Sequence, residues 1–342
     1  MSPRGGLAGL AVFAAGVVAG IAAEELLYRR TFGGVDPEAG EPLGALRGEP
    51  IEVLARDGTR LHAEAFGADD GPGIVLCHGF TLRLDSWHYQ IRDLVRDGRW
   101  RVVAYDARGH GRSGVVGPNG LAPSVLAEDL EAVLHQTGVR PAVVAGHSMG
   151  GIMVQALGRF GARFPEEVGE HVRGVVLLNT TFTSAMGAWR DGRVRSSRLR
   201  DRLLVVGDGI SARAEALERF RFPASDLAML LTRLGFGATA SPAHVAFTRR
   251  MIDATPTSTF ASGIGGMMNF DLHAGLEKLD VPVLIIAGTR DLITPAFLSR
   301  EMAARIPEAE LVELENVGHM AMLEQHEEVS GLIRSFAERV LT

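Results

Sequence analysis

The pentapeptide Gly146-His147-Ser148-Met149-Gly150 lies between two apolar runs, and it is the stretch of this chain best suited to chemistry. The run before it reads as a buried strand, and the run after it, Ile152–Leu157, reads as a helix. A serine hydroxyl is a weak nucleophile, so an enzyme that uses one exposes it at a sharp strand-to-helix turn, with glycines where the backbones pass closely. We therefore predict that Ser148 is a catalytic nucleophile.

A nucleophilic serine needs a histidine that takes its proton and a carboxylate that orients the histidine. Asp291 follows the strand pattern Val283–Ala287, and His319 follows the next one, Glu310–Leu314. Loops at the carboxyl ends of neighbouring parallel strands lie at the same edge of a sheet. The order Ser148, Asp291, His319 therefore predicts a catalytic triad.

Other residues of the same types fit these roles less well. His147 adjoins the serine, but neighbouring residues at such a turn point in different directions, so we interpret it as structural. His326 reads as part of an exposed helix, and His110 lies in a loop of the kind that braces a site. The strand pattern that ends before Asn179 offers no acid at that position, which favours Asp291.

A serine that attacks a carbonyl group creates an oxyanion, which two backbone N–H groups commonly stabilise. One is the N–H of the residue after the serine, here Met149, and the other comes from a loop after an earlier strand. The sequence Cys77-His78-Gly79-Phe80 follows the strand pattern Ile74–Leu76. We therefore predict Phe80 as the second donor.

The pattern of apolar residues predicts an α/β fold, with a mostly parallel sheet and helices on both faces. A hairpin over residues 51–55 and 61–66, with a turn at Asp57-Gly58-Thr59, comes first. Strand and helix patterns then alternate along the chain. The predicted strands are 74–76, 102–105, 142–144, 174–178, 283–287 and 310–314, and the predicted helices lie near 86–96, 123–137, 149–163, 294–306 and 321–340.

About a hundred residues separate the strand that ends at Asn179 from the strand that starts at Val281, where one crossover helix would suffice. We predict that residues 182–262 form a helical cap over the strand ends, between the two parts of the core, 51–181 and 263–342. Bulky apolar residues of this region either line an apolar acyl site or form the cap's own core. They are Phe182, Met186, Trp189, Phe236, Met267 and Met268.

The first 30 residues form an apolar segment, joined to the core by a predicted linker over residues 31–50. Residues 5–23 carry no charge and approach the ~20 residues that a helix needs to cross a bilayer. Their Ala, Gly and Val content also fits a cleaved signal peptide or a soluble apolar helix, so all three interpretations stay open. Membrane association through residues 5–23 or secretion is favoured over a cytoplasmic location.

Composition excludes several classes of function. The 342-residue chain has a formal net charge of -6, so no basic field favours nucleic acid. The single cysteine, Cys77, lies in an apolar run and cannot form an internal disulfide. His and Cys do not cluster at ligand spacing, and no G-x-G-x-x-G follows a first strand, so we expect neither a metal ion nor a dinucleotide cofactor.

Together these motifs resemble the α/β-hydrolase superfamily, in its serine esterase and lipase branch, over residues 51–340. The motifs that carry the resemblance are His78-Gly79, Asp106–Gly114, Gly146–Gly150, Asp291 and His319. The resemblance implies an α/β-hydrolase fold with an inserted cap, and hydrolysis of a small carboxylic ester with an apolar acyl group, without a cofactor.

Alternatives on the same triad stay open, namely thioesterase, C–C bond hydrolase and cofactor-free perhydrolase or haloperoxidase activity. A non-catalytic ligand-binding protein with this fold is an alternative from another class. Epoxide hydrolases and dehalogenases are similar in layout but carry an aspartate nucleophile, so Ser148 argues against both.

Overall fold

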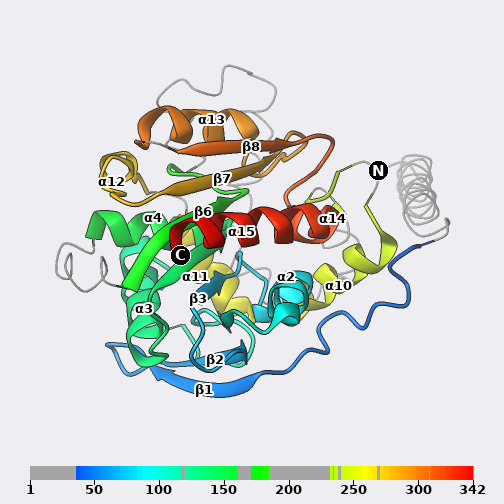
Figure 1. The fold of residues 1–342 in the computed structure, drawn as a ribbon, viewed down its shortest axis with the longest axis horizontal. Coiled ribbons are helices and arrows are strands. Elements are labelled where there is room, and N and C mark those ends of the chain that lie inside the picture. Colours follow the sequence, from blue (N-terminus) through cyan, green and yellow to red (C-terminus); the bar gives the residue numbers. More distant parts are fainter. Residues whose placement is uncertain are drawn as a thin grey trace, which may run out of the picture.

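The strands of this protein form one twisted sheet that runs through the middle of the domain (Figure 1). The structure is a computed structural model that describes residues 36–116, 120–160, 171–184, 232–233, 235–237, 240–267, 270–307 and 309–341. Within these ranges the sheet has eight strands in the order β1-β2-β4-β3-β5-β6-β7-β8. The strands are β1 Glu49–Leu54, β2 Arg60–Gly67, β3 Gly73–Cys77, β4 Arg101–Tyr105, β5 Ala142–His147, β6 Val172–Leu178, β7 Val283–Gly288 and β8 Glu310–Leu314.

The strand directions match those expected from the sequence. β1 and β2 form the antiparallel hairpin, and β2 is also antiparallel to β4. From β4 onward every neighbouring pair is parallel. The carboxyl ends of β3 and β5 to β8 therefore meet at one edge of the sheet, and the predicted fold class is confirmed.

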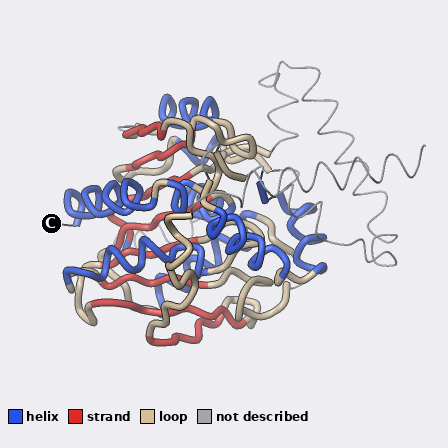
Figure 2. Tube along the Cα trace, turned by 90° about the vertical axis from the view of Figure 1, so that its right-hand side faces the viewer, coloured by secondary structure: helices blue, strands red, loops and turns tan. Residues whose placement is uncertain are grey.

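Helices cover both faces of the sheet (Figures 1 and 2). Successive strand residues point to opposite faces, so Val75 belongs to one apolar cluster whereas Ile74 and Leu76 belong to the other. The first cluster includes residues of α3, α4 and α13, and the second includes residues of α2, α10, α14 and α15. The helices are α2 His88–Leu94, α3 Pro123–Gln136, α4 Met149–Phe160, α10 Pro242–Asp253, α11 Thr257–Met267, α12 His273–Leu276, α13 Ala296–Arg305, α14 Ala321–Glu324 and α15 His326–Leu341.

Residues 36–48 contain no helix or strand and are bound to the helices by side-chain hydrogen bonds. The Tyr89 hydroxyl donates to Glu38 over 2.6 Å, and the Ser241 hydroxyl donates to Asp36 over 2.7 Å. The apolar segment 5–23 lies outside the described residues. Among the helices that are described, none combines the length and the apolar character needed to cross a membrane.

The insertion between β6 and β7 is described only in part. Its described helices are α10, α11 and α12. α10 begins at Pro242 after Ser241, whose hydroxyl accepts from the N–H of His244 as an N-cap. The predicted cap over 182–262 falls mostly on residues 185–231, outside the described ranges, and stays a prediction.

The turn from β5 into α4 leaves no space for side chains at its glycines. A Cβ on Gly146 would lie 2.5 Å from the backbone of Gly150, and a Cβ on Gly150 would lie 2.1 Å from the carbonyl oxygen of Cys77. Both distances are well inside van der Waals contact, so the start of α4 lies directly against the end of β3. This contact brings the loop after β3 next to the turn.

The substitution Gly150→Ala tests this contact. Alanine favours a helix over glycine by up to about 1 kcal/mol, yet here we expect destabilisation by about 1–3 kcal/mol, because the added methyl group overpacks a rigid backbone contact. Gly331→Ala in α15, where a Cβ meets nothing within 4 Å, is the matched control and should be stabilising. Urea unfolding measures both, and a Gly150→Ala variant as stable as the wild type contradicts the packing argument.

Candidate active site

Ser148 occupies the bend between β5, which ends at His147, and α4, which begins at Met149. Its φ of 51° lies in the left-handed region, which a residue with a side chain rarely adopts. The bend is held by hydrogen bonds on both sides. The Ser148 N–H donates to the carbonyl of Leu178 over 3.1 Å, and the hydroxyl of Thr180 donates to the Ser148 carbonyl over 2.7 Å.

Asp291 and His319 lie in the loops after β7 and β8, and the structure brings them together. The Nδ1 atom of His319 is 2.8 Å from Oδ2 of Asp291, and both residues are buried, with 6% and 4% of their surface exposed. A carboxylate can only accept a hydrogen bond, so Nδ1 carries the proton. The Nε2 atom of the neutral ring is then free to accept a proton.

Donors surround the carboxylate of Asp291. Oδ1 accepts the N–H groups of Ile293 and Thr294, and Oδ2 accepts the Thr294 hydroxyl, the Asn179 amide and His319. Burial by itself would raise the pKa of this carboxyl, but His319 and the hydrogen bonds outweigh it and lower the pKa to about 2. Asp291 therefore stays ionised over the range in which a histidine titrates.

The backbone of the loop that carries His319 is fixed by side chains at the ends of β5 and β6. Asn179, at the end of β6, donates to the carbonyl of Gly318 over 3.1 Å as well as to Asp291 over 2.8 Å. The Nε2 atom of His147 lies 2.9 Å from the carbonyl of His319, and burial holds the pKa of His147 well below its usual value. His147 is therefore neutral and donates from Nε2, one residue before the serine.

No hydrogen bond joins the Ser148 hydroxyl to His319 among the described residues. Hydrogen bonds of this kind commonly tighten only in the complex with substrate. Ser148 instead packs against the loop after β3. A Cβ added to Gly79 in this loop would lie only 3.2 Å from the Cβ of Ser148.

The loop after β3 holds Phe80, whose N–H is the predicted oxyanion donor. The Nε2 atom of His78 accepts from the N–H of Ala107 over 2.9 Å, so Nδ1 carries the proton and donates to the carbonyl of Gly79 over 2.7 Å. Because the peptide is planar and trans, fixing this carbonyl points the N–H of Phe80 the opposite way. Burial lowers the pKa of His78 to about 4, so this neutral form persists near pH 7.

The peptide after Phe80 is fixed as well. Thr81 has a φ of 62°, its N–H donates to Nε2 of His110 over 3.1 Å, and its carbonyl accepts the Thr255 hydroxyl over 3.2 Å. His110 therefore braces this loop, in agreement with its sequence interpretation. Among the described residues, the N–H groups of Phe80 and Met149 have no protein acceptor, so both are available to a ligand.

The predicted substrate-lining residues divide into two sets. Phe182 is fully buried in the cluster under α4, Met267 packs against the same cluster, and Phe236 is buried in the other cluster. These contacts place the three residues in the apolar clusters on the two faces of the sheet, and their role in substrate binding stays a prediction. Met186, Trp189 and Met268 lie outside the described residues.

Sequence reasoning missed several contacts of the site. In the sequence, Asn179 marks only the absence of an acid at that position, and none of the motifs includes Thr294. Glu324, which accepts the N–H of Gly318 over 2.9 Å, belongs to none of the motifs that predict the site. Two local signals could have indicated these residues. Asn179 is a short polar residue directly after a strand, and Thr294 is a short polar residue three positions after Asp291. Within the described ranges no group of three His, Cys, Asp or Glu side chains is arranged to hold a metal ion.

Known proteins share both the sequence and the fold. The family model described as alpha/beta hydrolase fold matches residues 72–325. AB hydrolase superfamily protein YisY of Bacillus subtilis is 31% identical over 288 residues, which cover 82% of this chain and 97% of the relative. The 3-oxoadipate enol-lactonase 1 of Acinetobacter baylyi is 26% identical over 85% of this chain and 97% of its own length.

Solved structures agree on the fold. An esterase from Exiguobacterium antarcticum superposes with a TM-score of 0.70 at 21% identity, and the match covers 86% of this chain and all of that one. The family match spans most of the chain, and its range includes the strained serine and the Asp291–His319 pair. This protein therefore belongs to the α/β hydrolase fold family, as its motifs predicted.

Proposed function

We propose that this hydrolase cleaves carboxylic esters through an acyl-enzyme on Ser148. The observation that carries the proposal is the buried hydrogen bond between Asp291 and His319, at the sheet edge where Ser148 is held in a strained turn. The family membership supports hydrolysis, and the named esterase and lactonase relatives act on bonds of this chemical class.

The proposed ester hydrolysis consumes only the ester and one water molecule. His319 Nε2 takes the proton of Ser148 as Oγ attacks the ester carbonyl, and the N–H groups of Phe80 and Met149 stabilise the oxyanion. The C–O bond to the alcohol then breaks, and His319 returns the proton to the leaving oxygen. Water attacks the acyl-enzyme with His319 again as base, which releases the acid and restores the serine. Asp291 keeps the proton on Nδ1 throughout.

Fluorophosphonate labelling tests the nucleophile directly. We expect one covalent adduct on wild-type protein and none on Ser148→Ala, because the probe reacts with an activated serine. Ser258→Ala, an exposed serine of α11, should label like the wild type. A folded wild-type protein that stays unlabelled contradicts the proposal. Rates on p-nitrophenyl esters of increasing acyl length, lactones, acyl thioesters and β-diketones then separate ester hydrolysis from the alternatives.

Asp291→Asn should lower kcat by about 10⁴-fold, because an amide no longer holds the proton on Nδ1 of His319. The control is Asp271→Asn, since Asp271 makes a similar hydrogen bond to His273 at 2.6 Å but in an exposed position. This control should keep wild-type kcat. Equal rates for wild type and Asp291→Asn would remove Asp291 from the mechanism.

The same variant has a pH-dependent effect on stability. The pKa of Asp291 is about 2 in the folded chain against an ordinary 3.8, which corresponds to about 2 kcal/mol of stabilisation. Because the pKa of Asp291 is lower in the folded chain than in the unfolded chain, the ionised carboxylate stabilises the fold fully at pH values above the unfolded-state pKa. This stabilisation is lost as the pH falls through the folded-state pKa. The wild type should therefore lose its excess stability over Asp291→Asn between about pH 4 and pH 2 in denaturant titrations.

We propose further that the charge-free residues 5–23 anchor the chain to a membrane and take no part in hydrolysis. All the proposed catalytic groups lie after residue 48, and the charge-free length suits a membrane helix. Removing residues 1–30 should leave kcat unchanged and shift the protein from the membrane fraction to the soluble fraction. Recovery of the uncleaved full-length chain only from the soluble fraction contradicts the anchor, and a mature N-terminus near residue 24 indicates a signal peptide instead.

A further inference from the structure

Glu324, the last residue of α14, holds two backbone amides at once. Its Oε1 atom accepts the N–H of Gly318 over 2.9 Å, and its Oε2 atom accepts the N–H of Gly237 over 2.6 Å. Gly318 precedes His319, whereas Gly237 lies within the insertion between β6 and β7, before α10. The carboxylate therefore bridges the loop of the proposed base and a segment more than 80 residues away in sequence.

The two bridged segments are in direct backbone contact. A Cβ on Gly318 would lie 2.5 Å from the nitrogen of Gly237, and a Cβ on Gly237 would lie 2.2 Å from the carbonyl oxygen of Asn316. The N–H of Met320 also donates to the carbonyl of Gly235 over 3.0 Å. Because the two backbones are in direct contact, we expect that loss of a hydrogen bond to Glu324 shifts both the loop at Gly318 and the segment at Gly237.

The Glu324 contact completes the restraint on the peptides around His319. The N–H of Gly318 is held by Glu324, the carbonyl of Gly318 by Asn179, and the carbonyl of His319 by His147. An imidazole whose backbone is fixed on both sides has little freedom except its own side-chain rotation. The Asp291 hydrogen bond then fixes that rotation.

The charge state of Glu324 matters for this restraint. Burial raises the pKa of this carboxyl to about 7, against the lowering effect of its N–H donors, and the charge of Asp291 adds to the rise. An ionised carboxylate accepts one N–H on each oxygen, whereas a protonated acid turns one oxygen into a donor. Protonation therefore costs one of the two amide contacts.

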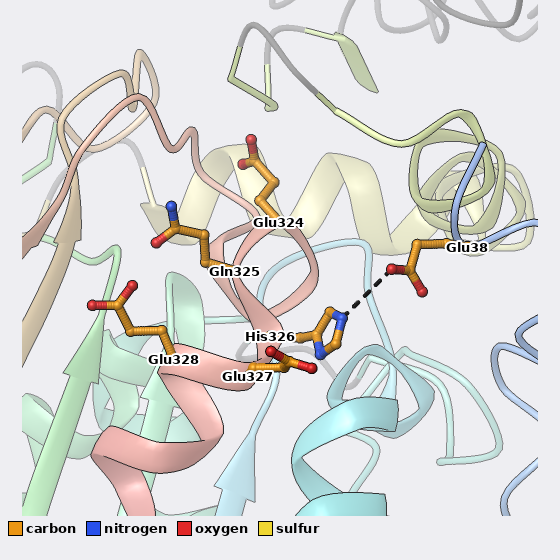
Figure 3. Close-up of a pocket in the computed structure, with 6 residues that line it drawn as sticks. All are labelled: Glu38, Glu324, Gln325, His326, Glu327 and Glu328. Atoms are coloured by element: carbon orange, nitrogen blue, oxygen red, sulfur yellow. Dashed lines mark ion pairs between the residues drawn. The ribbon is translucent and has the colours of Figure 1, made fainter. Parts of the chain in front are cut away.

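Other titratable groups line the pocket beside this carboxyl. Figure 3 shows Glu324 with Glu38, Gln325, His326, Glu327 and Glu328 around a pocket of about 390 Å³, its carboxylate directed away from the His326 ring. On the side of the insertion, Arg233 donates to the carbonyls of Phe236 and Gly237 over 3.2 and 2.8 Å. Besides burial, the negative charge of Asp291 favours the proton on Glu324.

We propose that Glu324 is a positioning residue for His319, and that its ionised carboxylate holds the base-bearing loop against the segment 235–237 in the geometry that catalysis needs. The inference rests on the proposed function of His319 as base. Activity then requires two deprotonations, of His319 and of Glu324, and not one.

The steepness of the pH profile is the first test and needs no variant. For the wild type, log(kcat/KM) on a p-nitrophenyl ester should reach a slope of two per pH unit on the acid side, because two groups must lose a proton. Glu324→Gln, which has the same shape and only one acceptor oxygen, should show a slope of one. A wild-type slope that never exceeds one overturns the proposal.

The second test separates positioning from a structural role. Misplacement of a base by about 1 Å can cost about a hundredfold in rate, so Glu324→Gln should lose about tenfold to a hundredfold in kcat with little change in KM. The control is Glu327→Gln, an exposed residue of the same pocket, which should keep wild-type values. A loss of activity fully explained by a lower melting temperature of Glu324→Gln overturns the proposal.

A readout without substrate distinguishes failure of this inference from failure of the proposed function. The Nδ1 proton that His319 shares with Asp291 should give a proton NMR signal far downfield, absent in Asp291→Asn. In Glu324→Gln this signal should shift or broaden even if no ester is ever found to be cleaved. An unchanged signal in Glu324→Gln overturns the inference, whereas an unlabelled and inactive wild type that shows the signal overturns only the esterase proposal.

Discussion

The close packing of backbone at the turn after β5 is the constraint on which the site depends. Ser148 adopts a φ of 51° there, and Gly146 and Gly150 lie so near their neighbours that a methyl group would overlap backbone atoms. Strain of this kind persists only where the surrounding structure over-determines it. The hydrogen bonds from Ser148 to Leu178 and from Thr180 do so, and they join the turn to the end of β6.

A chain of polar contacts extends from this turn along the carboxyl edge of the sheet. Asn179 connects β6 to Asp291 and Gly318, and His147 connects the serine turn to the carbonyl of His319. Each contact joins loops of different strands, so no single loop determines where the imidazole lies. A buried polar network of this kind holds one geometry because any shift leaves a buried donor or acceptor unpaired.

Neutral histidines and ionised carboxylates have separate roles in this network. Burial keeps His78 and His147 neutral, so each can donate from one nitrogen to a carbonyl. Asp291 stays charged because His319 and four further hydrogen-bond donors compensate its burial, whereas Glu324 has fewer donors and a raised pKa. The two carboxyl groups thus differ in charge because Asp291 pairs directly with His319, whereas the N–H donors of Glu324 do not outweigh its burial.

The sequence alone determined the order of strands and helices, the fold class, and the identity of Ser148, Asp291 and His319 as the candidate triad. It could do so because hydrophobic period and turn chemistry are local, and because a parallel sheet brings its strand ends to one edge. The partners of these residues came only from the tertiary structure. Asn179 and Glu324 contact the site through segments far apart in the chain, with Glu324 and Gly237 separated by 87 positions. No local pattern encodes such a contact, since it exists only where packed backbones leave room for one carboxylate between two amides.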